Sequence, residues 1–255
     1  MPTAWPAEAI WEQVYPWLPN FTVEILPEVD STNSELMRRA RAGQTEPTLL
    51  VAERQTAGRG RMGRVWQSQP GDSLTFSLSL PIAPKDWSGL SLAVGLSLAE
   101  SLHPQVGLKW PNDLWVQERK LGGILVEAAS MGGRSQVVIG VGLNIRPRPA
   151  DGMNTPPAAL TEWLPDISAP SALALVAAPL IQTVLAFEQS GFGPLQARFE
   201  ARDVLKGRRV HTSDGAQGTS LGVSSSGALR LQTDAGVLDI HSSEVSVRPF
   251  AEDKP

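Results

Sequence analysis

The chain has 255 residues, of which 42% are hydrophobic, so it is long enough for one substantial core and a small second domain. Its formal net charge of -4 argues against broad binding of nucleic acid or anionic membranes, which usually requires an overall basic chain. It contains no cysteine, which excludes a disulfide framework, a thiolate nucleophile and a cysteine-ligated zinc ion.

The first residues, 1–20, lack both a basic start and a continuous apolar run, so they are not typical of a signal peptide. No later stretch is expected to be long and apolar enough to span a bilayer. Together with the missing cysteine, these features favour a soluble protein of the reducing cytoplasm, with no membrane contact.

The first third of the chain is predicted to alternate between helices and strands. Apolar residues at helical spacing indicate helices, whereas alternation of apolar and polar residues indicates strands. The second helix has the clearest start signal, because Thr32 and Glu35 form the pattern of a capping box. The expected elements are a helix over 7–18, a strand over 21–26, a helix from about 31 to 43, a strand over 48–53, a loop over 54–64 and a half-buried strand over 74–80.

The middle of the chain predicts one helix followed by four short strands. The helix has leucine and valine residues four apart and ends before Pro104. The strands are joined by turns such as Pro111-Asn112 and Gly132-Gly133, which are too short for crossover helices, so the sheet should be largely antiparallel or mixed. The expected elements are a helix over 87–102 and strands over 106–110, 114–116, 121–128 and 137–145.

The last part of the chain changes from helical to β character. After an irregular, proline-rich stretch, Ser171 is expected to cap a helix that runs to residue 186, with a kink at Pro179. A shorter helix follows over 194–202. Beyond Lys206, short β segments are separated by turns that end in glycine, at 214–215, 226–227 and 235–236.

These elements predict an α+β fold in which a mixed, largely antiparallel sheet packs with helices. We assign this domain to residues 1–205. Residues 206–255 are predicted to form a separate small β-barrel.

The segment GRGRMGRVW, Gly58 to Trp66, has the composition of an anion-binding loop. Its glycines let backbone N–H groups approach an anion, and Arg59, Arg61 and Arg64 supply planar donors for carboxylate or phosphate. It is neither a GxxxxGK[ST] phosphate loop nor a dinucleotide fingerprint. By composition alone, a disordered or RNA-binding segment also fits.

Two lysines flank one turn in the segments KWPNDLWV and KLGGILVE. A single lysine in a strand is usually just solvated, but Lys109 follows apolar residues and Lys120 precedes a glycine pair where a ligand can approach the backbone. Asn112 and Asp113 fit an Asx turn as well as a role in a site.

Other candidate residues give weaker signals. The glycines of GVGLN, residues 140–144, indicate a bulge, a bent strand or a surface cleared for a ligand. Trp66 fits either a core position or stacking on a base. The histidines lack acidic partners at metal spacing, so no metal ligand is assigned.

In this order and spacing, GRGRMGRVW, KWPND, RKLGGIL and GVGLN resemble the biotin protein ligase family, from near Asp30 into the C-terminal barrel. The resemblance implies a catalytic fold like that of class II aminoacyl-tRNA synthetases, followed by an SH3-like barrel. It implies an enzyme that uses ATP to convert biotin to biotinyl-5′-AMP. The biotin is then transferred to a lysine of a biotin carboxyl carrier protein of acetyl-CoA carboxylase or a related carboxylase.

The resemblance also implies roles for individual residues. The residues expected to contact biotin are Ser31, Thr32, Asn33, Gln55, Gly58, Arg59, Lys120 and Gly122. Those expected to contact the nucleotide are Arg61, Arg64, Trp66, Lys109, Asn112 and Asn144. The expected catalytic residues are Lys120, Arg59 and Asp113, with Asp113 orienting or deprotonating the carrier amine. Mg²⁺ is expected to be held mainly by the ATP phosphates.

The chain departs from the family pattern in two ways. Too few residues precede Asp30 for the winged helix-turn-helix of members that double as repressors, so we expect a monofunctional ligase without DNA binding. Met62 and Val65 stand where many members have a basic residue, which makes the loop less cationic. The resemblance allows a homodimer. A lipoate ligase or octanoyl transferase, a biotin-sensing regulator and an RNA binder stay open as alternatives.

Overall fold

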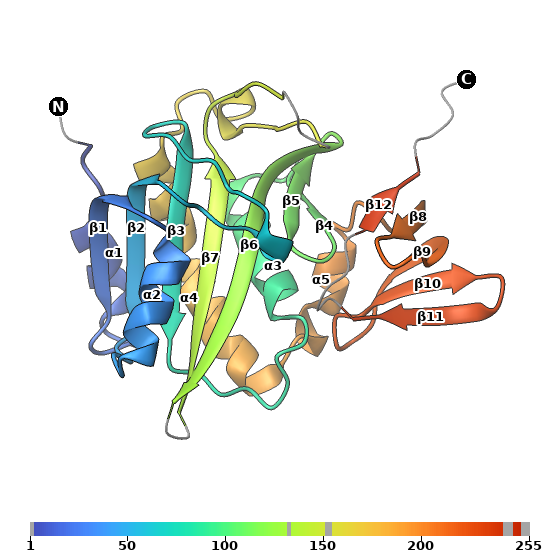
Figure 1. Ribbon diagram of the computed structural model, residues 1–255, viewed down its shortest axis with the longest axis horizontal. Helices are drawn as coiled ribbons and strands as arrows, with labels where there is room; N and C mark the ends of the chain where they lie inside the picture. The colour runs from blue at the N-terminus through green and yellow to red at the C-terminus, as the bar shows by residue number, and fades with distance from the viewer. Residues whose placement is uncertain (1–2, 132–133, 151–154, 242–246, 251–255) are drawn as a thin grey trace.

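The computed structural model describes residues 3–131, 134–150, 155–241 and 247–250. Within these residues the chain forms a seven-stranded sheet and a five-stranded sheet, which lie side by side in Figure 1. The larger sheet has the order β1-β2-β3-β7-β6-β5-β4, in which β1 and β2 are parallel and the other neighbours are antiparallel. The mixed, largely antiparallel sheet expected from the short connections is thus confirmed. Its strands are β1 (Thr22–Val29), β2 (Thr48–Gln55), β3 (Ser73–Leu80), β4 (Gly107–Lys109), β5 (Asp113–Val116), β6 (Arg119–Met131) and β7 (Arg134–Asn144).

Helices cover both faces of the larger sheet. Helices α1, α3 and α4 pack on one face with the main apolar core, whereas α2 covers the other face over a small cluster that includes Leu50 and Val138. Figure 1 shows α2 in front of the strands and α4 behind them. The helices are α1 (Ala7–Val14), α2 (Thr32–Arg41), α3 (Leu90–Leu102), α4 (Ala169–Ser190) and α5 (Gln196–Glu200).

Strand β3 was expected to be half-buried, and this prediction is wrong because all eight of its side chains are buried. Its leucines and Phe76 enter the main core, while its serine and threonine side chains lie on the other face and find polar partners there. The Oγ1 of Thr75 donates to the carbonyl of Ala52 at 2.9 Å, and Nε2 of Gln136 donates to Oγ of Ser79 at 2.8 Å. A polar strand face can therefore be buried because its hydrogen bonds are made.

Helix α2 begins one residue earlier than a capping box at Thr32 requires. Ser31 is the N-cap, and its Oγ accepts the backbone N–H of Ser34 at 3.4 Å. The side chain of Glu35 is instead engaged by arginines of the same helix. The predicted capping box is wrong, but the predicted start of the helix is correct to within one residue.

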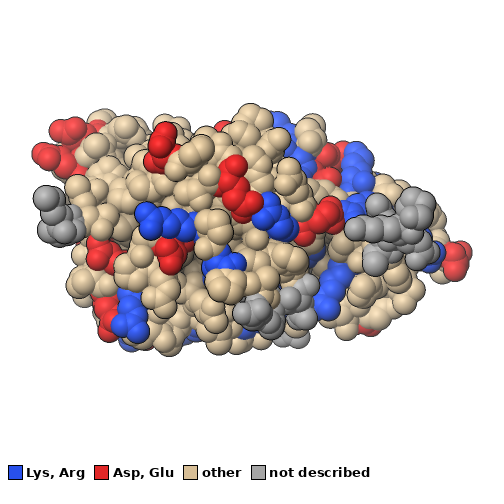
Figure 2. Space-filling view, turned by 90° about the horizontal axis from the view of Figure 1, so that it is seen from above, with Lys and Arg blue, Asp and Glu red and all other residues tan. Residues whose placement is uncertain are grey.

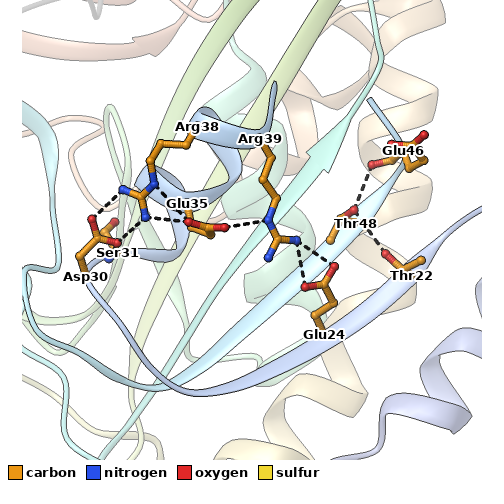
Figure 3. Close-up of polar contacts among 9 residues, drawn as sticks. All are labelled: Thr22, Glu24, Asp30, Ser31, Glu35, Arg38, Arg39, Glu46 and Thr48. Carbon is orange, nitrogen blue, oxygen red and sulfur yellow. Dashed lines mark hydrogen bonds and ion pairs between the residues drawn. The ribbon is translucent and has the colours of Figure 1, made fainter. Parts of the chain in front are cut away.

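A chain of ion pairs fastens the outer face of α2 to the edge of the sheet (Figure 3). Arg38 binds Asp30 and Glu35, and Arg39 binds Glu35 and Glu24, with N···O distances of 2.7 to 2.8 Å. The hydrogen bond from Arg38 lowers the pKa of Asp30 to about 2. These pairs link α2 to β1, through Glu24, and to Asp30, the residue directly before the N-cap.

Helix α4 corrects two expectations. It is capped by Ser168 rather than Ser171 and continues past Pro179 to Ser190. By length and composition alone it is apolar enough to cross a membrane, contrary to the expectation that no stretch would be. Its buried residues, however, pack into the main core against α3 and β3. The helix therefore has the environment of a core helix.

The five-stranded sheet follows α5 and is antiparallel throughout, in the order β11-β10-β9-β8-β12. Its strands are β8 (Arg209–Thr212), β9 (Gln217–Val223), β10 (Leu229–Thr233), β11 (Gly236–Ile240) and β12 (Val247–Pro249). Nε1 of the buried Trp110 donates to the carbonyl of Gly227 at 3.0 Å, and Leu108 of β4 forms a parallel bridge with Asp203. The small sheet thus packs against the β4 side of the larger one. A domain boundary after residue 205 stays a prediction.

The hairpin of β6 and β7 is longer than expected. The predicted strands over 121–128 and 137–145 extend to Arg119–Met131 and Arg134–Asn144. The predicted turn at 132–133 lies outside the described residues. The earlier start of β6 places Lys120 within the strand, next to Gly123, Ile124 and Leu125, and all four residues line one cavity.

Candidate active site

A cavity of about 570 Å³ lies on the α2 side of the sheet, between the first turn of α2, the loop after β2 and the β5–β6 hairpin. All of the predicted site residues line it except Gly58, Gly122 and Asn144. The residues that the structure brings together are Ser31, Thr32, Asn33, Gln55, Arg59, Arg61, Arg64, Trp66, Lys109, Asn112, Asp113 and Lys120. Residues that are distant in sequence therefore share one site.

The end of the cavity at α2 is built from neutral polar groups. Gln55 Oε1 accepts the backbone N–H of Thr32 at 2.8 Å and its Oγ1 hydroxyl at 3.2 Å. Ser77 Oγ lies 2.7 Å from Thr32 Oγ1 and 2.6 Å from Asn33 Oδ1. Because these groups already satisfy one another, their positions are set before a ligand arrives. This end suits a neutral ligand group with both hydrogen-bond donors and acceptors.

Two glycines of β7 make room for side chains that line the cavity. A Cβ on Gly140 would lie 2.2 Å from Asn33 Oδ1, and one on Gly142 would lie 2.3 Å from the indole ring of Trp66. The pairing of β7 with β3 and β6 is continuous in register across both glycines, so the bulge considered for this segment is absent from the described strand. The glycines clear space for this chain's own Asn33 and Trp66.

The opposite end of the cavity concentrates charge. Lys120 Nζ lies 2.6 Å from Asp113 Oδ1, and Lys109 Nζ lies 4.0 Å from Asp113 Oδ2. Strand pairing places Lys109 opposite Asp113, and a register shift after Leu114 accompanies the approach of Lys120. One carboxylate is therefore shared by two lysines.

Burial lowers the pKa of two cationic side chains in this cavity, Lys109 and Arg61. Desolvation lowers the pKa of Lys109 to about 8, although the nearby carboxylate of Asp113 opposes the shift. Lys109 also lies over the ring of Trp115, with Nζ 4.9 Å from the centroid. Desolvation likewise lowers the pKa of Arg61, whose Nη1 donates to Asn112 Oδ1 at 3.2 Å. Cations held with so little water are well placed to receive an anion.

The glycine-arginine loop forms a tight hairpin over the cavity. Trp66 N–H donates to the carbonyl of Gly58 at 2.9 Å, and Gly60 N–H donates to that of Arg64 at 2.7 Å. At its tip, Met62 has a φ of 55° and is 55% exposed. Gly58 lies at the base of the hairpin, where a Cβ would collide with the carbonyl of Trp66 at 2.3 Å, so a glycine is required there.

Two of the predicted residues outside the lining have other surroundings. Gly122 lies against β7, where a Cβ would meet the carbonyl of Gly142 at 2.6 Å. Asn144 is 1% exposed, and its Nδ2 donates to the carbonyls of Lys120, at 3.1 Å, and Ala158, at 2.9 Å. In this structure Asn144 therefore holds the backbone that carries Lys120.

The lining also includes residues that sequence patterns did not reveal. Arg148 lies over the ring of Trp66, 5.3 Å from its centroid, and Arg248 reaches the site from β12 of the small sheet. The carbonyl of Pro156 accepts the backbone N–H of Lys120 at 2.9 Å. None of these residues belongs to a short motif, so only the folded chain brings them to the cavity.

Comparison with family models gives two matches. Residues 26–144 match the Biotin/lipoate A/B protein ligase family, and residues 207–248 match the biotin protein ligase C-terminal domain. The first match contains all of the cavity residues predicted from motifs, and the second covers most of the small sheet.

Similar curated proteins and structures agree with these matches. The chain is 35% identical over 250 residues to the bifunctional ligase/repressor BirA of Escherichia coli, covering 93% of this chain and 77% of that protein. It is 30% identical over 240 residues to a biotin–[acetyl-CoA-carboxylase] ligase of Paracoccus denitrificans, covering 87% of this chain and 98% of that protein. Among solved structures, it resembles a biotin protein ligase from Aquifex aeolicus in complex with biotin and ATP, with a TM-score of 0.77 and 31% identity, covering 91% of this chain and 100% of that chain.

Proposed function

Since this chain belongs to the biotin/lipoate A/B protein ligase family, we propose that it is an ATP-dependent biotin protein ligase. It activates biotin as biotinyl-5′-AMP and transfers it to a lysine of a carboxylase subunit. The observation that carries this proposal is the pairing, in one cavity, of a neutral polar end with a cationic end where two lysines share Asp113. The first end fits the ureido ring of biotin, and the second fits a carboxylate and a phosphate.

In the first step, a biotin carboxylate oxygen attacks the α-phosphorus of ATP, and the bond to pyrophosphate breaks. Two anions must meet, and at 4 Å their repulsion rises from ~1 kcal/mol in water to about 4 kcal/mol at an effective dielectric of about 20. We assign Lys120 to both anions, with Lys109 and Arg59 adding positive charge around them. Cations fixed in advance stabilise the transition state without reorganisation.

In the second step, the amine of the carrier lysine attacks the carbonyl of the mixed anhydride, and AMP leaves. The amine must first lose a proton. Asp113 lies 15% exposed at the cationic end, where it orients or deprotonates the incoming amine once Lys120 is engaged by phosphate. Positioning then supplies most of the remaining catalysis, because AMP is a good leaving group.

Mg²⁺ fits this site as an ion carried by ATP rather than as a resident metal. The described cavity lining contains two carboxylates, Asp113 and Glu118, and each is already paired with a cation. Mg²⁺ binds through one or two carboxylates together with substrate phosphates in many nucleotide sites. We therefore propose that the phosphates hold the ion, and that it neutralises their charge.

The remaining proposals concern partners and location. We propose a biotin carboxyl carrier protein as the acceptor, a cytoplasmic location and, as the family resemblance allows, a homodimer. DNA binding is not part of the proposal, because α1 and β1 pack with the catalytic core. RNA binding is not favoured either, because the face in Figure 2 shows basic and acidic side chains side by side rather than one continuous basic area.

The test is mass spectrometry of a biotin carboxyl carrier domain after incubation with this protein, biotin and MgATP. The expected result is a mass increase of one biotinyl group on one lysine. A parallel reaction with lipoate in place of biotin addresses the lipoate ligase alternative. Modification by lipoate but not by biotin would contradict the proposed function.

A further inference from the structure

Glu127 lies on β6 outside the cavity lining, yet it holds two side chains that line it. Its Oε2 accepts a hydrogen bond from Arg59 Nη2 at 2.5 Å and another from Asn33 Nδ2 at 2.9 Å. Arg59 belongs to the glycine-arginine loop, and Asn33 belongs to the first turn of α2. One carboxylate oxygen therefore joins the loop to the neutral end of the cavity.

We propose that Glu127 is a positioning residue for biotin, which sets Arg59 and Asn33 in the arrangement that receives the ligand. This inference rests on the proposed function, because it assigns biotin to the end of the cavity at α2. Glu127 itself does not line the cavity, so its effect on biotin passes through the two side chains that it holds.

Glu127 and the carbonyl of Leu125 together set which way the amide of Asn33 points. Asn33 is 3% exposed, and its Nδ2 also donates to the carbonyl of Leu125 at 3.2 Å. Both of these partners only accept hydrogen bonds, so Nδ2 must face them and Oδ1 must face Ser77. A neutral group that can also donate, in place of the carboxylate, leaves only the carbonyl of Leu125 to require this orientation. The amide would then be held in it less strongly.

The bond to Arg59 fastens one side of the loop, while Arg61 fastens the other side through Asn112. The side chains of Arg59 and Glu127 are 45% and 27% exposed, so their ion pair is accessible to water. Such pairs are weak and are screened by salt. Glu127 thus holds Arg59 at the cavity through an ion pair that salt can weaken.

The experiment compares biotin binding by wild-type protein and Glu127→Gln, measured by calorimetry without ATP. The glutamine keeps the shape of the side chain but removes the charge. We expect the biotin dissociation constant to rise about fivefold to tenfold, with the KM for ATP changed less than about twofold. Raising the salt concentration should weaken biotin binding by the wild type and have less effect on the variant.

Glu28→Gln is the matched control. Glu28 pairs with Arg54 at 3.0 Å on the exposed edge of the sheet, away from the cavity lining. Its substitution should leave biotin binding unchanged. A double-mutant cycle with Arg59→Gln adds a second check, because coupled residues give non-additive effects. In the double variant, biotin binding should be weakened by less than the product of the two single effects.

Two results would overturn the inference. One is biotin binding by Glu127→Gln equal to that of the wild type, and the other is an equal loss of affinity for biotin and ATP, which indicates only a general structural role. Failure of the proposed function looks different, because then the wild type itself binds no biotin. Direct binding by the wild type therefore separates the two claims.

Discussion

The two ends of the cavity use polar groups in opposite ways. At the α2 end, hydroxyl and amide groups of Thr32, Asn33 and Gln55 make hydrogen bonds within the protein and carry no net charge. At the hairpin end, Lys109 and Lys120 share one carboxylate, and burial has lowered the pKa of Lys109 to about 8. The polar groups at the α2 end have hydrogen-bond partners without a ligand. At the hairpin end, the charged groups have lost part of their hydration free energy on burial.

Because of this difference, we expect the α2 end to set mainly the affinity for biotin and the hairpin end to set mainly the reaction rate. A group that is already hydrogen-bonded in place offers the same geometry to the ground state and the transition state, so it mainly sets affinity. Buried cations act most strongly where negative charge gathers during reaction, so they mainly set the rate. Substitutions at the α2 end should therefore change the KM for biotin. Those at the hairpin end should change adenylate formation.

The largest effect is expected for Lys120→Ala. Removal of this ammonium group takes away the cation assigned to both reacting anions, so adenylate formation should fall by about a hundredfold to a thousandfold. Pyrophosphate release measures this step, and circular dichroism should show an intact fold. Lys206→Ala is the control, because Lys206 pairs with Glu200 outside the cavity. Near-normal pyrophosphate release by Lys120→Ala would contradict the assignment.

A smaller and more selective effect is expected for Thr32→Val. The valine keeps the shape but loses a hydroxyl that contacts Gln55 and Ser77, so the KM for biotin should rise about tenfold while that for ATP stays constant. Thr75→Val is the control, since Thr75 is equally buried but does not line the cavity. If both variants raise the KM for biotin alike, the neutral end has no special role in binding.

The pH dependence of ATP use should reveal Lys109. Its pKa near 8 means that the charged form prevails below that pH, so kcat/KM for ATP should fall about threefold to tenfold as pH rises through 8. Lys109→Arg keeps its charge and should remove this fall. A decline of equal size in both proteins would point to another group.

The free energy of unfolding should also depend on Lys109, but it should rise with pH where kcat/KM for ATP falls. The pKa of Lys109 is about 8 in the folded protein and 10.5 in an unperturbed lysine, so between these values the unfolded chain binds more protons. The free energy of unfolding should therefore rise with pH across this range. Lys109→Met should lack that rise in urea unfolding curves measured at several pH values.

The smallest effect is expected where the two sheets meet. Glu118, 60% exposed in the β5–β6 turn, pairs with Arg208 at 2.7 Å, and Glu118→Gln should lower the rate of adenylate formation by about twofold. Asp239→Asn is the control, because Asp239 pairs with Arg230 within the small sheet. If Glu118→Gln lowered the rate of adenylate formation as much as Lys120→Ala does, the β5–β6 hairpin would be far less rigid than its strand pairing indicates.

Periodicity and motifs predicted the order of the main elements, and all but three of the site residues predicted from motifs line the cavity. This worked because each motif lies where a strand ends or turns, so its residues stay close to one another in space. The loop from Gly58 to Trp66 and the lysine pair are local features of this kind. Their assigned roles stay predictions until the variants are measured.

The remaining features depend on residues distant in sequence. Glu127, Arg148 and Arg248 reach the site only through the pairing of β6 with β7 and the packing of the small sheet. For the glycines at 140 and 142, a bulge, a bent strand and space for a ligand all stayed open, because nothing local shows that Asn33 and Trp66 fill that space. Strand lengths and cap positions also depended on tertiary contacts, as for β6 and α2.

The contribution of β12 to the cavity makes the site a joint product of both sheets. Val247, Arg248 and Pro249 line the site, although they belong to the small sheet. The wall that they form depends on how the small sheet packs against the β4 side of the larger one. A substitution that loosens this packing would therefore change the cavity without altering any residue of the larger sheet.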